Sequence, residues 1–122
     1  MTVAGLGFRS GASVASLRAA LAAAGGADGV TALATSEAKA GAAVILAFAA
    51  ELGLPVVGVS TVDLAAQSTL TDSARVREKT GAGSLAEAAA LAAIGSDARL
   101  LAPRATSPDH MATAAIAESA KP

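Results

Sequence analysis

The segment VAGLGFRSGAS at residues 3–13 combines glycines, serines and an arginine directly after a short apolar run. A turn that leads from a strand into a helix leaves backbone N–H groups free to bind an anion. Arg9 would add a planar guanidinium that binds a carboxylate or a phosphate through two hydrogen bonds. Alternatively, Gly5, Gly7 and Gly11 only permit tight turning and close packing, and Arg9 lies in solvent. The segment is therefore a candidate anion site with a structural alternative.

The glycine spacing of this segment differs from that of the common nucleotide-binding motifs. A dinucleotide-binding fingerprint has glycines at its first, third and sixth positions, but Ser10 occupies the sixth position here. The acidic residue that binds a ribose is also missing, because the second expected strand ends in Leu33-Ala34-Thr35. The Gly-Lys-Ser/Thr tripeptide of a Walker loop does not occur in the chain. We therefore expect no nucleotide cofactor, and no other cofactor is indicated.

Polar side chains also follow the other strands that the sequence predicts. In an open parallel sheet, ligands bind beyond the carboxyl ends of the strands, so these side chains are expected to meet at one edge. For Ser36 the alternative role is a helix cap, and for Lys39 it is a surface lysine on a first helical turn. The candidate ligand-binding residues at these ends are Phe8, Arg9, Ser10, Thr35, Ser36, Lys39 and Ser60.

Two residues are candidates for acid or base catalysis. In a hydrolase, Glu37 or His110 would activate water, and Lys39 or the amides of the first helix would stabilise the oxyanion. Alternatively, Glu37 is an acid that compensates the helix dipole, and His110 belongs to a solvated polar loop. No second group that would pair with either residue can be named, so the catalytic residues stay open. No metal site is expected.

Composition excludes several classes of function. The 122 residues are 53% hydrophobic and 16% charged with a net charge of −1, which is typical of one globular domain. A weak net charge and two phenylalanines as the only aromatic residues argue against nucleic-acid binding. The chain has no cysteine, which excludes disulfides and thiolate chemistry.

No membrane or targeting segment is predicted. The longest apolar run, residues 40–50, is shorter than a membrane span and is followed by Glu51. The first residues resemble a strand and lack the basic region of a signal peptide, so we expect a cytoplasmic protein.

The first half of the chain alternates strands and helices. Strands are predicted over residues 2–6, 30–34 and 55–59, and helices over 14–24 and 37–52. Such alternation with short connections predicts a parallel sheet that is covered on both faces. The third strand is rich in valine and is expected in the middle of the sheet.

The regular alternation of strands and helices ends after Val59. A helical turn is predicted from Ser60 through residue 66, then a polar connector over 67–72, and helices near 73–80 and over 84–94. Ser84 and Glu87 have the spacing of a capping box. Strands over 99–102 and 111–117 are joined by a loop, which favours an antiparallel pair. We therefore predict one α/β domain over residues 1–122, a three-layer α/β/α fold with a mixed, mostly parallel sheet of about five strands.

The order of several short blocks resembles a known family. The chain is similar to the C-terminal domain of the cobalt-precorrin-5A hydrolase (CbiG) of cobalamin biosynthesis and to its stand-alone CobE-type relatives. The resemblance covers nearly the whole chain. It is carried by GLGFRSG at 5–11, LATSEAK at 33–39, LGLP at 52–55, TG at 80–81 with SLAEAAA at 84–90, LLAPR at 100–104 and ATAAIA at 112–117.

The resemblance implies a role between precorrin and the corrin ring. Such a tetrapyrrole carries several carboxylates around an apolar ring, so Arg9, Lys39 and Arg104 would each anchor a carboxylate, with Phe8 against the macrocycle. The favoured role is a module that binds or hands on a pathway intermediate. One alternative is a hydrolase that opens a δ-lactone; this is less favoured because the chain begins at the first strand, without a counterpart of the hydrolase's N-terminal domain. Another alternative is a partner of other cobalamin-pathway enzymes that does not bind the pigment.

Overall fold

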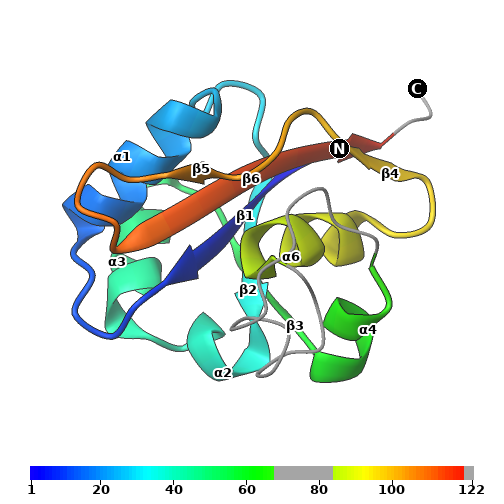
Figure 1. The fold of residues 1–122 in the computed structure, drawn as a ribbon, viewed down its shortest axis with the longest axis horizontal. Helices are drawn as coiled ribbons and strands as arrows, with labels where there is room; N and C mark the ends of the chain where they lie inside the picture. Colours follow the sequence, from blue (N-terminus) through cyan, green and yellow to red (C-terminus); the bar gives the residue numbers. More distant parts are fainter. Residues whose placement is uncertain (68–83, 120–122) are drawn as a thin grey trace.

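A mixed β-sheet runs through the middle of the molecule, with helices on both sides (Figure 1). The structure is a computed structural model that describes residues 1–67 and 84–119. The strands in these ranges are β1 (Thr2–Phe8), β2 (Ala32–Ser36), β3 (Val56–Val59), β4 (Ala98–Leu100), β5 (Ala105–Thr106) and β6 (Ala112–Ser119). The helices are α1 (Val14–Ala24), α2 (Glu37–Ala40), α3 (Ala43–Leu52), α4 (Thr61–Ala65) and α6 (Leu85–Ile94).

The strands are ordered β3-β2-β1-β6-β4, and β5 pairs with β6 beside this row. β1, β2 and β3 are parallel neighbours, whereas β6 is antiparallel to β1, β4 and β5. In the described part of the chain, β6 therefore runs against all the other strands. This confirms the predicted mixed, mostly parallel sheet and its antiparallel last strand.

Each face of the sheet packs against its own helices, which confirms the predicted three-layer architecture. On one face, Leu6 of β1 packs with Leu17 of α1 and Phe48 of α3. On the other face, Val3 of β1 packs with Leu85 of α6. Because successive side chains of a strand point to opposite faces, β1 supplies residues to both cores. Figure 1 shows α6 on one side of the sheet and α1 with α3 on the other.

Helix α6 approaches β1 closely because Gly5 carries no side chain. A Cβ at Gly5 would lie 1.9 Å from the carbonyl oxygen of Ala86 and 2.8 Å from the backbone nitrogen of Ala90, both in α6. A Cβ at Gly7 would lie 2.8 Å from Oγ1 of Thr113 in β6. Both glycines lie inside β1, which extends two residues beyond its predicted end. Close packing is thus what these two glycines permit.

The single helix expected over residues 37–52 is wrong, because two helices occupy this range. Gly41 ends α2, and Ala42 is extended with φ −67° and ψ 140° before α3 begins. Residues 38–43 are alanines, a glycine and one lysine, so the sequence has no large apolar side chains whose spacing would reveal the break. The break lets α2 pack on Gly58 of β3, where an added Cβ would lie 3.1 Å from the Cβ of Ala40.

The expected central position of the third strand is also wrong. Among the strands of residues 1–67 and 84–119, β3 lies at the edge of the sheet, because β2 lies on one side of β1 and β6 on the other. A run of β-branched residues indicates a pleated, half-buried surface, and an edge strand with helices on both faces offers this as well as a central one.

Smaller differences concern where elements begin. β2 starts two residues later than expected, because the N–H of Val30 turns back to the carbonyl of Ala27. The segment between β4 and β6 contains the short strand β5, where a loop was expected. The helix predicted near residues 73–80 lies outside the described residues.

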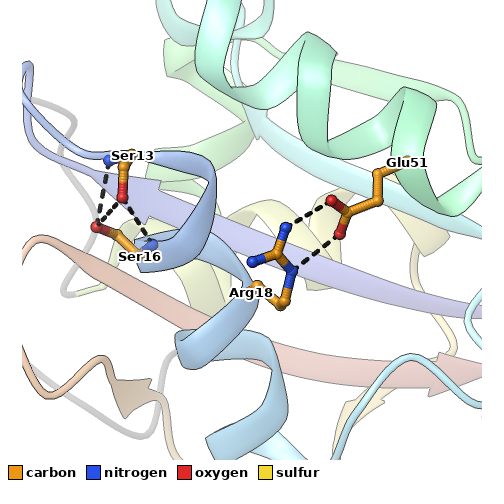
Figure 2. A network of polar contacts seen from close by, with 4 residues as sticks. All are labelled: Ser13, Ser16, Arg18 and Glu51. Atoms are coloured by element: carbon orange, nitrogen blue, oxygen red, sulfur yellow. Dashed lines mark hydrogen bonds and ion pairs between the residues drawn. The ribbon is translucent and has the colours of Figure 1, made fainter.

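Serine side chains cap the starts of α1, α4 and α6. Ser13 forms a capping box with Ser16, in which each side chain accepts a hydrogen bond from the backbone N–H of the other at 3.2 Å (Figure 2). Ser84 accepts from the N–H of Glu87 at the start of α6. These caps satisfy N–H groups that a helix start leaves without a partner.

An ion pair joins α1 to α3 on the surface. Arg18 donates to Glu51 through Nε at 3.0 Å and Nη2 at 2.5 Å (Figure 2). The hydrogen bond from Arg18 lowers the pKa of Glu51, and the same bond raises the pKa of Arg18. The pair is exposed to solvent, so its contribution to the stability of the fold is small.

Candidate functional site

The carboxyl ends of the parallel strands lie at one edge of the sheet, as expected. There, an open cavity of about 690 Å³ lies between α2, α4 and α6. Its lining includes a carboxylate, an ammonium group and two hydroxyls beside apolar side chains. The lining residues are Ser36, Glu37, Ala38, Lys39, Thr61, Leu64 and Leu85. This mixture suits a ligand that has both an apolar body and charged groups.

Lys39 links this cavity to the end of β1. Its Nζ donates a hydrogen bond of 2.8 Å to the carbonyl oxygen of Phe8 and lies 5.0 Å from the centre of the Phe8 ring. Phe8 is half-buried and packs against the core shared by α1 and α3. The cation–π contact and the hydrogen bond together hold the Lys39 ammonium at the cavity. Phe8, whose ring was expected to lie against a macrocycle, thus packs on the core and contacts the lysine.

The three hydroxyl candidates differ in their surroundings. Thr35 is fully buried, and its hydroxyl donates to the carbonyl oxygen of Leu6 at 2.8 Å. The Ser60 hydroxyl caps α4 by accepting from the N–H of Asp63. Ser36 stands at the N-cap position of α2 without a side-chain cap bond, and it lines the cavity. Of the three, Ser36 thus has the hydroxyl best placed for a ligand, and the expectation that it caps a helix through its side chain is wrong.

Arg9 and Ser10 lie exposed in the loop between β1 and α1. The N–H of Arg9 donates to the carbonyl oxygen of Met111 at 2.9 Å, and the Arg9 carbonyl accepts from Gly11 and Ala12. The backbone of Arg9 is therefore held while its side chain faces solvent. Because Lys39 binds the carbonyl of the preceding residue, both cations are brought to the end of β1.

Arg104 lies beside the start of α6. Its backbone N–H donates to Oε2 of Glu87 at 2.8 Å, and Glu87 is fully buried in the first turn of the helix. The sequence identified Glu87 as a capping residue and missed this contact with Arg104. The available signal was that Glu87 is the one charged residue in the apolar helix over residues 85–94.

His110 lies at the tip of the turn between β5 and β6. It is exposed, has a left-handed φ of 59°, and its N–H donates to the carbonyl oxygen of Ser107. It does not belong to the residues that line the cavity, whereas Glu37 does. The two catalytic candidates therefore occupy different parts of this edge.

Asp109, which the sequence did not single out, organises this turn. Its Oδ1 accepts from the Ser107 hydroxyl at 2.5 Å and from the N–H of Met111 at 3.1 Å. Its Oδ2 accepts from the Ser16 hydroxyl at 2.6 Å. The hydrogen bond from Ser107, followed by those from Ser16 and Met111, lowers the pKa of Asp109 to about 2.

The Asp109 carboxylate predicts a specific acid sensitivity. A lowered pKa contributes stability above the unfolded-state value of 3.8, and this contribution disappears as the pH falls to about 2. Asp109→Asn should therefore be less stable than the wild type near neutral pH, and the difference should shrink between about pH 4 and pH 2. Urea midpoints of both proteins across this range measure it. A difference that does not change with pH would contradict the prediction.

Other types of site are not indicated. In residues 1–67 and 84–119, no helix has the length and apolarity to cross a membrane. Within the same ranges, no group of three or more His, Cys, Asp or Glu side chains is arranged to hold a metal ion.

The fold and the cavity define an open-sheet α/β domain with a polar and apolar cavity at the carboxyl ends of its parallel strands. Residues 2–117 match the family model described as cobalamin synthesis G C-terminus. The chain belongs to this family of cobalamin biosynthesis proteins, as its sequence blocks indicated.

Two solved structures extend the comparison. CobE, described as a protein from the cobalamin (vitamin B12) biosynthetic pathway, is 30% identical with a TM-score of 0.81, over 96% of this chain and 92% of that chain. The cobalamin biosynthesis protein chiG from Agrobacterium tumefaciens strain C58 is 40% identical with a TM-score of 0.74, over 99% of this chain and all of the other. A search of curated protein sequences gives no significant match.

Proposed function

We propose that the chain binds a carboxylated tetrapyrrole intermediate of cobalamin biosynthesis and hands it on to a pathway enzyme. The observation that supports this most is the Lys39 ammonium, which Phe8 holds at a cavity of about 690 Å³. Ala38 is the exposed apolar residue of the lining and would contact the ring, and Ser36 would donate to a peripheral carboxylate. Arg9, which is exposed just after β1, and Arg104 would bind further carboxylates of the ligand.

Lys39 and Arg9 are the anchors whose loss should matter most. A charge-assisted hydrogen bond contributes about 1.5–3 kcal/mol, so Lys39→Ala and Arg9→Ala should each weaken binding by about one to two powers of ten. Arg9→Lys should also weaken binding, because lysine lacks the planar two-pronged donor. The measurement is a titration with cobyrinic acid, a corrin whose peripheral side chains are free carboxylates, followed through its visible bands.

Two controls make this titration specific. Arg99→Ala removes a cation that pairs with Glu118 at the opposite end of β6, so affinity should not change. Cobinamide, in which the carboxylates are replaced by amides, should bind weakly and show no dependence on Arg9 or Lys39. Equal affinity of all variants for cobyrinic acid, or no binding by the wild type, would contradict the proposal. A stable complex with a pathway enzyme but no pigment binding would support a purely protein-binding role instead.

Lactone hydrolysis is a second candidate because Glu37 and Lys39 line the same cavity. Glu37 would take a proton from water as the oxygen attacks the lactone carbonyl, and Lys39 would stabilise the oxyanion that forms. Collapse of this oxyanion would break the ring C–O bond, and the protonated Glu37 would return its proton to the leaving alkoxide oxygen. Incubation with a precorrin that carries the δ-lactone tests this directly. Ring opening by the wild type that Glu37→Gln abolishes would favour the hydrolase, and an unchanged pigment would favour binding without turnover.

A further inference from the structure

We propose that Asp109 is the positioning residue for Arg9. Its carboxylate holds the turn between β5 and β6 against α1, and this turn holds the loop that carries Arg9. The inference rests on the proposed function, since Arg9 is there an anchor for a ligand carboxylate.

Asp109 is linked by hydrogen bonds to both ends of the loop of residues 9–13. At the start of the loop, the N–H of Met111 donates to Asp109, and the carbonyl of Met111 accepts from the N–H of Arg9. At the far end, Asp109 accepts from the hydroxyl of Ser16, which forms the capping box with Ser13 (Figure 2). A single carboxylate thus connects both ends of the loop to one turn.

Several hydrogen bonds hold the turn between β5 and β6 in one conformation. The Ser107 hydroxyl donates to Asp109 and accepts from the N–H of Ala112, and Ser107 and Ala112 also pair through their backbones at 2.8 Å. His110 adopts a left-handed φ of 59°, which is uncommon for a residue with a side chain. Asp109 and the backbone bond from His110 to Ser107 hold this conformation in place.

Packing and hydrogen bonds inside the loop also fix the backbone of Arg9. The N–H groups of Gly11 and Ala12 both donate to the Arg9 carbonyl, so the loop closes on Arg9 itself. A Cβ at Gly11 would lie 3.2 Å from Cε of Met111, which shows that the turn lies directly against the loop. A guanidinium on a fixed backbone loses less conformational freedom when it binds a carboxylate, so its bond contributes more to affinity.

A double-mutant cycle separates positioning from a general structural role. Asp109→Asn places an amide N–H group opposite one of the two serine hydroxyls, and should weaken cobyrinic acid binding about three- to tenfold. In the Arg9→Ala background the same change should have no further effect. In the Lys39→Ala background it should keep its full effect, because Lys39 donates to Phe8 in β1, whereas Asp109 contacts the loop that follows β1.

Ser16→Ala provides a second variant. It removes the bond to Oδ2 of Asp109 and the bond that the Ser16 hydroxyl accepts from the N–H of Ser13, and it leaves the contacts of Ser107 and Met111 with Asp109. It should show the same dependence on Arg9. Asp97→Asn is the matched control, since Asp97 accepts from the Ser119 hydroxyl at the opposite end of β6. Its affinity should equal that of the wild type.

The outcomes distinguish the two hypotheses. If the wild type binds and Asp109→Asn binds equally well, the positioning role is overturned and the proposed function stands. Equal losses in all three backgrounds would indicate a structural role alone and would also overturn it. If the wild type does not bind, the proposed function fails and the role of Asp109 fails with it.

Discussion

Gly5→Ala is expected to lower the free energy of unfolding by about 3 kcal/mol or more. The added Cβ would lie 1.9 Å from the carbonyl oxygen of Ala86 and 2.8 Å from the nitrogen of Ala90. Both are backbone atoms of α6, so no side-chain rotation relieves the overlap, and the helix must move away from β1. The displacement would open the core around Val3 and Leu85. Urea unfolding followed by circular dichroism measures the loss.

Gly41→Ala is the matched control for this change. Within residues 1–67 and 84–119, an added Cβ at Gly41 meets no atom within 4 Å, and the φ of −93° at Gly41 is ordinary for alanine. This variant should be unchanged or more stable by about 0.4–1 kcal/mol, since alanine restricts the unfolded chain. Equal stability of Gly5→Ala and the wild type would show that α6 is not packed against β1 as described.

Glu87→Ala should cost about 2–4 kcal/mol of stability. The carboxylate is fully buried, and it accepts from the N–H of Arg104 at 2.8 Å. Alanine leaves that N–H without this acceptor and leaves a void beside the first turn of α6. The segment before β5 should therefore detach, which amide hydrogen exchange at Arg104 would report together with the shift in urea midpoint.

Two further variants define what Glu87 contributes. Glu87→Gln keeps the shape and an acceptor oxygen, so it should lose about half as much stability as the alanine variant. Glu37→Ala removes an exposed carboxylate from another first helical turn and should change stability by less than about 0.5 kcal/mol. If Glu87→Ala were as stable as Glu37→Ala, the buried contact would not be holding the segment.

The carboxylates of Glu87 and Asp109 attach the segment between β4 and β6 to the helices. Glu87 ties the segment before β5 to α6, and Asp109 ties the turn after β5 to α1. The two helices lie on opposite faces of the sheet (Figure 1). The chain between β4 and β6 is therefore anchored on both faces, at the edge where Arg9 and Lys39 lie.

Local patterns of the sequence determined most of the secondary structure. The alternation of strands and helices through Val59 was predicted, as was the serine cap at Ser84. These features depend on residues within a few positions of one another, so spacing and residue type are sufficient to predict them. The sequence blocks also identified the family, and the polar residues at the strand ends indicated the edge that carries the cavity.

Only the tertiary structure decided which of these residues meet. The bond from Lys39 to Phe8 spans 31 positions, and that from Ser16 to Asp109 spans 93. Both bonds depend on the strand order, in which β2 and β6 lie on either side of β1. The spacing of residues along the sequence does not predict this order. The edge position of β3 and the roles of Gly5, Glu87 and Asp109 follow from the same cause, because burial and partners are set by segments that are distant in the chain.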